Sequence, residues 1–388
     1  MKYDFDKVIN RRGTGCAKWD NLKEVFGRED ILPLWVADMD FEVPKEVREA
    51  ILKRAKHGIY GYTYRSQSFY ESIINWESKR HGLNINKEWL TFTPGVVSAL
   101  STAVLAFTEP SDSVIIQTPV YPPFYSVIRD NGRKIVENPL KEKNGHYYMD
   151  FDDLEKKIND KVKMLILCSP HNPVGRVWSK EELNKLCEIC IKNNILLVCD
   201  EIHSDIVYKG FKHIPIASLN EKAAQNSITC TAPSKTFNVA GLSCSVIIIP
   251  NENIRNKFNK QLDAIHIGSS NIFGLTALEA CYTYGEEWLN ELLTYLEANR
   301  DFVLNFIKNG MPEVEVSKPE GTYLMWLDFR KIEGDGKKLN DLIVNKAKVG
   351  MNNGINFGNK GEGFMRLNIA CPRSLLGEGL NRIKNAIK

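Results

Sequence analysis

Short apolar runs alternate with helical patterns between about residues 85 and 250 of the chain. Most of these runs carry Val, Ile or Leu on consecutive positions, and we therefore expect each strand to be buried on both faces. A mostly parallel sheet covered by helices produces this alternation of strand and helix. The predicted strands are SVIIQ (113–117), RKIVEN (133–138), KMLILC (163–168), NILLVCD (194–200), SITCT (227–231) and SVIIIP (245–250).

Helical patterns lie between and after these strands. Residues 98–108 and 181–193 predict two covering helices, and a long helical region begins at Phe273. It is followed by an α+β tail with two alternating strand candidates, TYLMWLDF (322–329) and FMRLNIA (364–370). The first 45 residues look irregular. We therefore expect two domains, a large α/β domain over 46–284 and a small domain built from 1–45 and 285–388.

The cysteines do not form a recognisable framework. There are nine of them, an odd number scattered along 388 residues, which argues against paired disulfides. Cys187 and Cys190 form a C-x-x-C motif, but they fall on the i, i+3, i+4, i+7 apolar stripe of a helix. Ser179 and Glu182 have the spacing of a capping box that starts this helix. We interpret the motif as a buried helix face, and no metal site is expected.

Composition excludes several classes of partner. A net charge of +3, without a run of basic residues, gives no reason to expect nucleic acid. No apolar stretch approaches the roughly 20 residues needed to cross a bilayer, and MKYDFDKVINRRG lacks the apolar core of a signal peptide. We therefore expect a cytoplasmic protein that does not bind membranes.

Polar and glycine-containing motifs follow several of the predicted strands. The C-terminal ends of parallel strands are where open α/β sheets bind ligands. A glycine directly before a helix, as in TPGVVSAL, leaves backbone amides free to bind an anion. The residues singled out by these motifs are Gly95, Val96 and Val97 in TPGVVSAL, Asn172 in SPHNPVG, Asp200 and His203 in DEIHSD, and Lys235 in APSKTFN.

In order and spacing these motifs resemble the fold type I enzymes that use pyridoxal 5′-phosphate (PLP). More narrowly, they resemble the MalY/PatB-type cysteine-S-conjugate β-lyases of the aminotransferase class I/II superfamily. The resemblance implies an α/β fold with a mostly parallel central sheet and a smaller α+β domain. It covers nearly the whole chain, in YDFDKVINRRGTGCAKWD, LPLWVADMDF, TPVYPP, SPHNPVGRVW, DEIHSDIV, PSKTFNVAGL, PEGTYLMWLDF and GEGFMRLNIACPR.

The resemblance assigns roles around the cofactor ring. Lys235 would form the Schiff base with PLP and, once displaced by substrate, act as general base. The alternative is that Lys235 is an exposed surface lysine without a catalytic role, and the apolar strand before Lys235 disfavours it. Asp200 would keep the pyridine nitrogen protonated, so that the ring serves as an electron sink. Asn172 would donate to the ring's phenolate oxygen, and His203 stands where aminotransferases usually carry a tyrosine that shares this bond.

Three further side chains complete the expected site. Tyr121 in TPVYPP would stack on the cofactor ring, with plain core packing as the alternative. Arg366 would grip the substrate α-carboxylate through two parallel hydrogen bonds. A structural salt bridge is the alternative for Arg366, and Arg373 is the nearest rival for its role. Tyr62 in IYGYTY resembles the tyrosine that reaches the phosphate in the neighbouring subunit, which implies a homodimer.

One position departs from the general aminotransferase pattern. Most aminotransferases of this fold carry a phosphate-binding arginine eight residues after the lysine, where this chain has Ser243. They carry a serine three residues before the lysine, where this chain has Ala232. The amides of Gly95 to Val97, the hydroxyl of Ser234 and the neighbour's Tyr62 would then have to hold the phosphate. The MalY-type pattern lacks the same arginine.

The resemblance implies an enzyme, a carbon–sulfur β-lyase that cleaves L-cystathionine or related cysteine S-conjugates to a thiol such as homocysteine, pyruvate and ammonia. Two alternatives stay open. A transaminase shares most of the site, and a PLP-bearing regulator that binds another protein needs none of the site residues to differ.

Overall fold

The computed structural model describes residues 2–269 and 271–388. Its main sheet has the strand order β2-β10-β9-β8-β7-β3-β4. Every neighbouring pair in it is parallel except those of β10, which is antiparallel to both β9 and β2. The predicted mostly parallel sheet is confirmed, with β2 as a strand that the apolar runs missed. The bounds are β2 (Leu90–Thr93), β3 (Ser113–Ile116), β4 (Lys134–Glu137), β7 (Val162–Cys168), β8 (Leu196–Asp200), β9 (Ser227–Thr231) and β10 (Ser245–Ile248).

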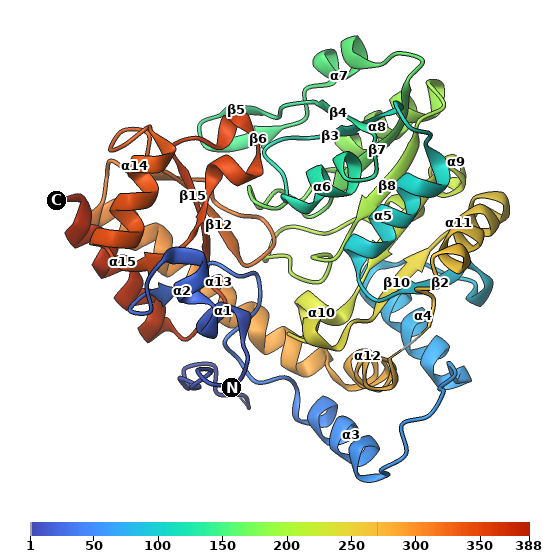
Figure 1. The fold of residues 1–388 in the computed structure, drawn as a ribbon, viewed down its shortest axis with the longest axis horizontal. Coiled ribbons are helices and arrows are strands. Elements are labelled where there is room, and N and C mark those ends of the chain that lie inside the picture. Colours follow the sequence, from blue (N-terminus) through green and yellow to red (C-terminus); the bar gives the residue numbers. More distant parts are fainter. Residues whose placement is uncertain (1, 270) are drawn as a thin grey trace.

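Helices cover both faces of this sheet (Figure 1). Successive side chains of a strand point to opposite faces, so on β7 Ile166 packs in the cluster that contains α5 and Leu165 in the cluster that contains α8. This two-sided burial explains the uninterrupted apolar runs. The edge strand β4 is the exception, since Lys134 is exposed and the rest of the strand is only partly buried. The expectation that every strand is buried on both faces was therefore wrong for β4.

The two covering helices predicted over 98–108 and 181–193 are present as α5 and α8, within two residues of the predicted bounds. The capping box of α8 is confirmed, because the Ser179 side chain accepts from the Glu182 amide and Glu182 bonds back to the Ser179 amide. The bounds are α3 (Lys45–Lys56), α4 (Gln67–His81), α5 (Val96–Phe107), α6 (Pro123–Arg129), α7 (Phe151–Lys157), α8 (Lys180–Lys192), α9 (Glu221–Gln225), α10 (Pro233–Thr236), α11 (Glu252–Ala264) and α12 (Ile272–Tyr284). A two-stranded ribbon joins β5 (Lys141–Lys143) to β6 (His146–Tyr148).

A smaller antiparallel sheet lies in the C-terminal part, in the order β11-β12-β15-β14. Both predicted strands are present, but β12 and β15 are buried along nearly their whole length and not on alternate residues, because each packs on both faces. The strands are β11 (Glu315–Val316), β12 (Leu324–Asp328), β14 (Asn352–Asn353) and β15 (Phe364–Asn368), and the helices are α13 (Glu286–Gly310), α14 (Gly336–Asp341) and α15 (Arg373–Ile387).

The N-terminal segment lies against this C-terminal part. Strand β1 (Leu32–Pro33) pairs in parallel with β13 (Val349–Gly350). Two short helices, α1 (Ala17–Asp20) and α2 (Leu22–Phe26), occupy a stretch that we expected to be irregular. The pairing agrees with the expected small domain, whose boundaries stay a prediction.

Cys187 and Cys190 are buried on α8, as the helix interpretation of the C-x-x-C motif predicted. Within residues 2–269 and 271–388, no group of three or more His, Cys, Asp or Glu side chains is arranged to hold a metal ion. The described helices also include none that is long and apolar enough to cross a bilayer.

Candidate active site

The predicted site residues lie at one edge of the main sheet. Asp200 is the last residue of β8, and Asn172 and Lys235 follow β7 and β9 within a few residues. Tyr121 follows β3, and Gly95 follows β2. These five strands run in the same direction, so their carboxyl ends meet at the same edge, where sheets of this kind bind ligands.

A cavity of about 320 Å³ opens at this edge. Of the eleven predicted site residues, all but Tyr62 and Arg366 line it. The lining also includes Ser98, Ile202 and Ser243, which takes the place of the expected arginine. The nine predicted residues that line the cavity are Gly95, Val96, Val97, Tyr121, Asn172, Asp200, His203, Ser234 and Lys235.

Lys235 is held inside the cavity on the short helix α10. Its amine donates to the backbone oxygen of Ala37 at 2.7 Å. Burial lowers the pKa of Lys235 to about 8, and the nearby Arg366 charge acts in the same direction. An amine with this pKa is partly neutral at physiological pH, and the neutral form is the one that attacks carbonyl groups and accepts protons. The surface-lysine alternative is therefore wrong.

Asp200 is a buried carboxyl with little to stabilise its charge. Its side chain accepts a hydrogen bond from the Ile202 amide at 3.2 Å, and no ion pair is formed with it among the described residues. Burial raises the pKa of Asp200 to about 7, although the Lys235 amine opposes this. A cationic N–H group that donates to this carboxyl would restore its ionised form.

His203 is also buried with unused hydrogen-bonding capacity. Its Nδ1 atom has no hydrogen-bond partner in the described part of the chain. Burial lowers the pKa of His203 to about 3, and the Lys235 and Arg366 charges add to this effect. The imidazole is therefore neutral, so that one of its ring nitrogens can donate and the other can accept. Its ring contacts Tyr323 edge-on, with 5.6 Å between ring centroids.

Arg366 lies on β15 of the small sheet and reaches the site through Asn172. Its Nη1 atom donates to Asn172 Oδ1 at 3.0 Å, which leaves the amide nitrogen of Asn172 as the group that can donate to a ligand. Its Nη2 atom donates to the Trp35 backbone oxygen and to Asn352 Oδ1. Burial lowers the pKa of Arg366 to about 10, so the side chain stays charged at neutral pH.

A structural salt bridge was the alternative role for Arg366, and Arg373 was its rival as the carboxylate-binding residue. Among residues 2–269 and 271–388, no carboxylate forms an ion pair with Arg366, so the structural salt bridge is not present. Arg373 is engaged elsewhere, because its Nε atom donates to Asn299 at 3.0 Å and its guanidinium lies over the rings of Tyr295 and Phe302.

The cavity is also lined by hydrogen-bond donors at the start of α5. Among the described residues that line it, there is no arginine, and Lys235 is the one lysine. Gly95 precedes the first turn of α5, whose first amides have no partner within the helix. The N-terminal end of a helix attracts anions through these amides and the helix dipole. Ser234 and Ser243 add hydroxyl groups at the same cavity.

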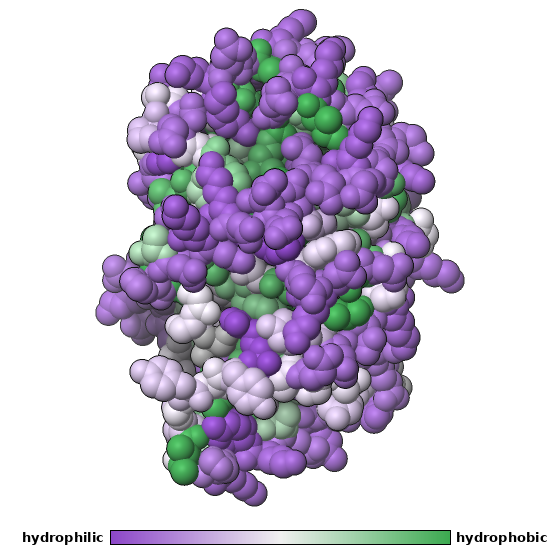
Figure 2. All heavy atoms as spheres, turned by 90° about the vertical axis from the view of Figure 1, so that its right-hand side faces the viewer, coloured by the Kyte–Doolittle hydropathy of each residue, from purple (hydrophilic) through white to green (hydrophobic). Residues whose placement is uncertain are grey.

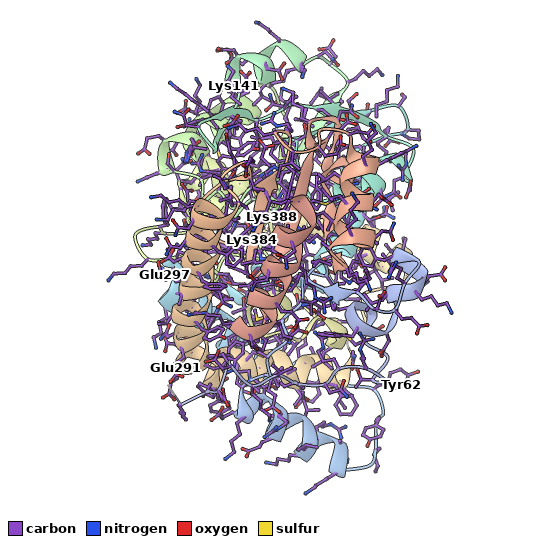
Figure 3. All side chains as sticks on the ribbon, turned by 90° about the vertical axis from the view of Figure 1, so that its left-hand side faces the viewer. Tyr62, Lys141, Glu291, Glu297, Lys384 and Lys388 are labelled. Atoms are coloured by element: carbon purple, nitrogen blue, oxygen red, sulfur yellow. The ribbon has the colours of Figure 1, made fainter. Side chains whose placement is uncertain are left out.

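Tyr62 is not part of the cavity in its own chain. It lies on the loop between α3 and α4, is fully exposed, and projects from the periphery of the molecule (Figure 3). This position is the one that a residue serving a neighbouring subunit would need.

A buried polar network lies behind the cavity and holds α10 in place. Asp205 accepts hydrogen bonds from Thr236, the residue after Lys235, and from Trp76. Its other oxygen is 3.0 Å from His81 Nε2. Burial alone would lower the pKa of His81, but the Asp205 carboxylate outweighs this and raises it to about 9. The pair is therefore ionic, and it fixes α4 against the helix that carries Lys235.

The sequence reasoning missed Tyr323, Asn368 and the backbone of Ala37. Tyr323 and Asn368 are fully buried, and both donate to the segment that carries Ala37. A signal for Asn368 existed, because it follows Arg366 by two residues on a predicted strand and so shares its face. The backbone oxygen of Ala37 has no signature in the sequence.

The fold and site together define an α/β protein that gathers a buried amine, a buried carboxyl and an anion-binding helix end around one cavity. The chain matches the family described as aminotransferase class I and II over residues 29–383, and it belongs to this family. It is 49% identical to the cystathionine beta-lyase PatB of Bacillus subtilis, over 99% of this chain and 100% of that protein. It is 33% identical to protein MalY of Escherichia coli, over 100% and 99% of the two chains.

A solved structure gives the same relationship in three dimensions. The PLP-bound C–S lyase from Staphylococcus hominis superimposes with a TM-score of 0.92 at 36% sequence identity, covering 99% of this chain and 98% of that one. The predicted fold class and the resemblance to the MalY/PatB-type enzymes are confirmed by these comparisons.

Proposed function

We propose that this chain is a PLP-dependent carbon–sulfur β-lyase that cleaves L-cystathionine or related cysteine S-conjugates. The observation that carries the proposal is the cavity at the sheet edge, where the Lys235 amine and the unpaired Asp200 carboxyl face the same space as the start of α5. The similarity to the B. subtilis β-lyase over 99% of the chain supports the lyase chemistry over transamination.

The residues of the cavity fit PLP group by group. The buried Asp200 carboxyl lacks a cation, which the protonated pyridine nitrogen would supply. The unpartnered Nδ1 of His203 and the amide nitrogen of Asn172 are suited to the ring's phenolate oxygen. The amides of Gly95 to Val97 and the Ser234 hydroxyl would hold the phosphate dianion. Tyr121 would lie against the ring, and Lys235 would bind the aldehyde carbon covalently.

When bound, PLP accepts electron density from the substrate's Cα atom and so makes its proton acidic. The chain's own groups do the rest. Arg366 would bind the α-carboxylate through two hydrogen bonds and so hold the substrate's Cα atom in one orientation. The released Lys235 amine takes the Cα proton onto Nζ, and the same ammonium can return a proton to the leaving sulfur.

The atoms balance without a second substrate. The Cα–H bond and the Cβ–S bond break, and the electron pair of the latter leaves with sulfur as the thiol is protonated. The remaining three-carbon fragment takes up water and leaves as pyruvate and ammonia. A transaminase differs at this point, because it needs a keto acid to restore the cofactor in every cycle.

We expect the purified holoenzyme to release pyruvate from L-cystathionine over many turnovers per cofactor, without added keto acid. Pyruvate is measured by a coupled dehydrogenase assay, with alanine as substrate for a control that has no sulfur leaving group. Steady amino-group transfer to a keto acid, with no pyruvate from cystathionine, would replace the lyase by the transaminase. Neither activity, together with recovery of one partner protein in a pull-down, would favour the regulatory alternative.

We further propose that the active unit is a homodimer with Tyr62 contributed across the interface. Near-neutral and hydrophobic side chains gather at the lower end of the face in Figure 2, where α3 and α4 lie. The loop between these helices exposes several large apolar and aromatic side chains, and a group of such side chains on the surface is typical of an interface with another protein. These side chains are Ile59, Tyr60, Tyr62 and Tyr64.

This arrangement predicts complementation between two defective variants. Lys235→Ala and Tyr62→Ala subunits, each with low activity alone, should regain activity after they are unfolded and refolded together. One site of the mixed dimer then combines an intact Lys235 with an intact Tyr62. Activity that never exceeds the sum of the two parents, in dimers verified by mass, would contradict a shared site.

A further inference from the structure

Five consecutive backbone oxygens, from Trp35 to Met39, each accept a hydrogen bond from a side chain. We call this segment the carbonyl strap. The donors come from the N-terminal segment, from the main-sheet region and from the small sheet, so the strap lies where these parts meet. The bonds are Arg366 to Trp35, Asn368 to Val36, Lys235 and Tyr323 to Ala37, Asn368 to Asp38, and Arg11 and Asn238 to Met39.

Asn368 braces the centre of the strap. Its Nδ2 atom donates to the oxygens of Val36 and Asp38, both at 2.6 Å, so both amide hydrogens are used. Its Oδ1 atom accepts from the Ala370 amide at 2.8 Å. The side chain is fully buried. The two braced oxygens flank Ala37, so Asn368 fixes the peptide groups on both sides of the oxygen that Lys235 contacts.

Tyr323 acts on the same oxygen directly. Its hydroxyl donates to Ala37 at 2.9 Å, and the Lys235 amine donates to it at 2.7 Å. A carbonyl oxygen has two lone pairs and can accept both bonds at once. The ring of Tyr323 is fully buried and packs against His203, which leaves the hydroxyl little freedom to move.

We propose that Asn368 and Tyr323 are positioning residues. They orient the Ala37 carbonyl and thereby fix the position of the Lys235 amine when it is not bound to PLP. This rests on the proposed function, in which that amine removes the Cα proton. A misplacement of the order of 1 Å can cost about a hundredfold in rate. Neither residue touches the reacting atoms, so each acts on Lys235 through the strap. The ring contact between Tyr323 and His203 is kept when only the hydroxyl is removed.

Two matched pairs of variants test the proposal in the holoenzyme. Asn368→Ala is paired with Asn299→Ala, because Asn299 is also fully buried and also bridges two backbone oxygens, those of Ile369 and Cys371. Tyr323→Phe is paired with Tyr208→Phe, because the Tyr208 hydroxyl is buried without a hydrogen-bond partner in the described residues.

We expect Asn368→Ala to lower kcat about tenfold or more and Tyr323→Phe about fivefold, in line with the loss of two bonds and one bond. KM should stay within about twofold, since Arg366 is intact, and the visible absorption of bound PLP should be retained. The isotope effect on kcat with Cα-deuterated cystathionine should increase, because proton removal becomes slower. The two control variants should leave kcat and the isotope effect unchanged.

A second measurement needs no turnover. In the cofactor-free chain, the Lys235 ammonium donates to the Ala37 oxygen. When Asn368 no longer holds this oxygen in position, the hydrogen bond to the ammonium weakens and the neutral amine is favoured. A short pulse of acetic anhydride at pH 7, read by mass spectrometry, should label Lys235 at least about twice as fast in Asn368→Ala. Asn299→Ala should label like the unmodified chain.

Equal losses of kcat in Asn368→Ala and Asn299→Ala would assign the effect to folding and overturn the proposal. Unchanged kcat and isotope effect in Tyr323→Phe, or unchanged labelling of Lys235 in Asn368→Ala, would overturn it as well. Failure of the unmodified holoenzyme to release pyruvate would contradict the lyase function and not the positioning proposal. The labelling experiment still decides the positioning proposal in that case.

Discussion

Replacing Lys235 by alanine is expected to abolish both the visible absorption of the protein and its lyase activity. The buried amine, with its pKa lowered to about 8, is the proposed covalent attachment point of PLP and the proposed base. Loss of a positioned general base alone typically costs about 10²–10⁴ in rate. We therefore expect kcat for pyruvate release to fall by at least about a thousandfold. Absorption spectra, borohydride reduction followed by peptide mapping, and the pyruvate assay check these expectations.

Lys384→Ala is a suitable control for this experiment. Lys384 lies on α15, whose side chains Figure 3 shows, and it is not among the residues that line the cavity. It should retain full absorption and activity. A borohydride-reduced adduct that persists in Lys235→Ala, on another lysine, would remove Lys235 from the proposed role.

The central strands of the main sheet could be predicted because they are buried on both faces. Burial of Leu165 and Ile166 on opposite sides of β7 requires apolar residues at consecutive positions, and such runs are visible in a sequence. Strand β2 was missed for the complementary reason. Its residues LTFT are buried, yet two of the four are threonines, and Thr93 is accommodated by a hydrogen bond to Ser245 on β10. A partner strand that distant cannot be inferred from the run itself.

The candidate site divides in a similar way. Lys235, Asp200 and Asn172 could be predicted because each follows a strand, and the ends of parallel strands meet by geometry. The position of Arg366 beside Asn172 depends on how the small sheet sits against the main one, which local pattern does not encode. The role of the Ala37 oxygen could not be predicted, since every residue carries a backbone oxygen and only the fold selects one.

The burial that makes Asp200 useful also makes it sensitive to replacement. Burial raises its pKa to about 7 in the ligand-free chain, so its ionised form depends on a cation opposite it. The proposed partner is the pyridinium nitrogen, whose positive charge stabilises the negative charge that develops on Cα. The amide introduced by Asp200→Asn would keep the size of the side chain. It carries no negative charge, so it could not keep the pyridine nitrogen protonated.

We expect Asp200→Asn to retain PLP, which is still attached through Lys235 and held at the start of α5, but to lose most of its turnover. A hydrogen bond to a charged group is worth about 1.5–3 kcal/mol, which corresponds to roughly 10- to 150-fold in kcat. The adjacent Glu201→Gln is the matched control, because Glu201 is equally buried but bonds His213 and the Ile216 amide away from the cavity lining. PLP content is measured by absorption and kcat by pyruvate release. If Asp200→Asn turns over as fast as Glu201→Gln at equal PLP content, Asp200 does not hold the ring nitrogen.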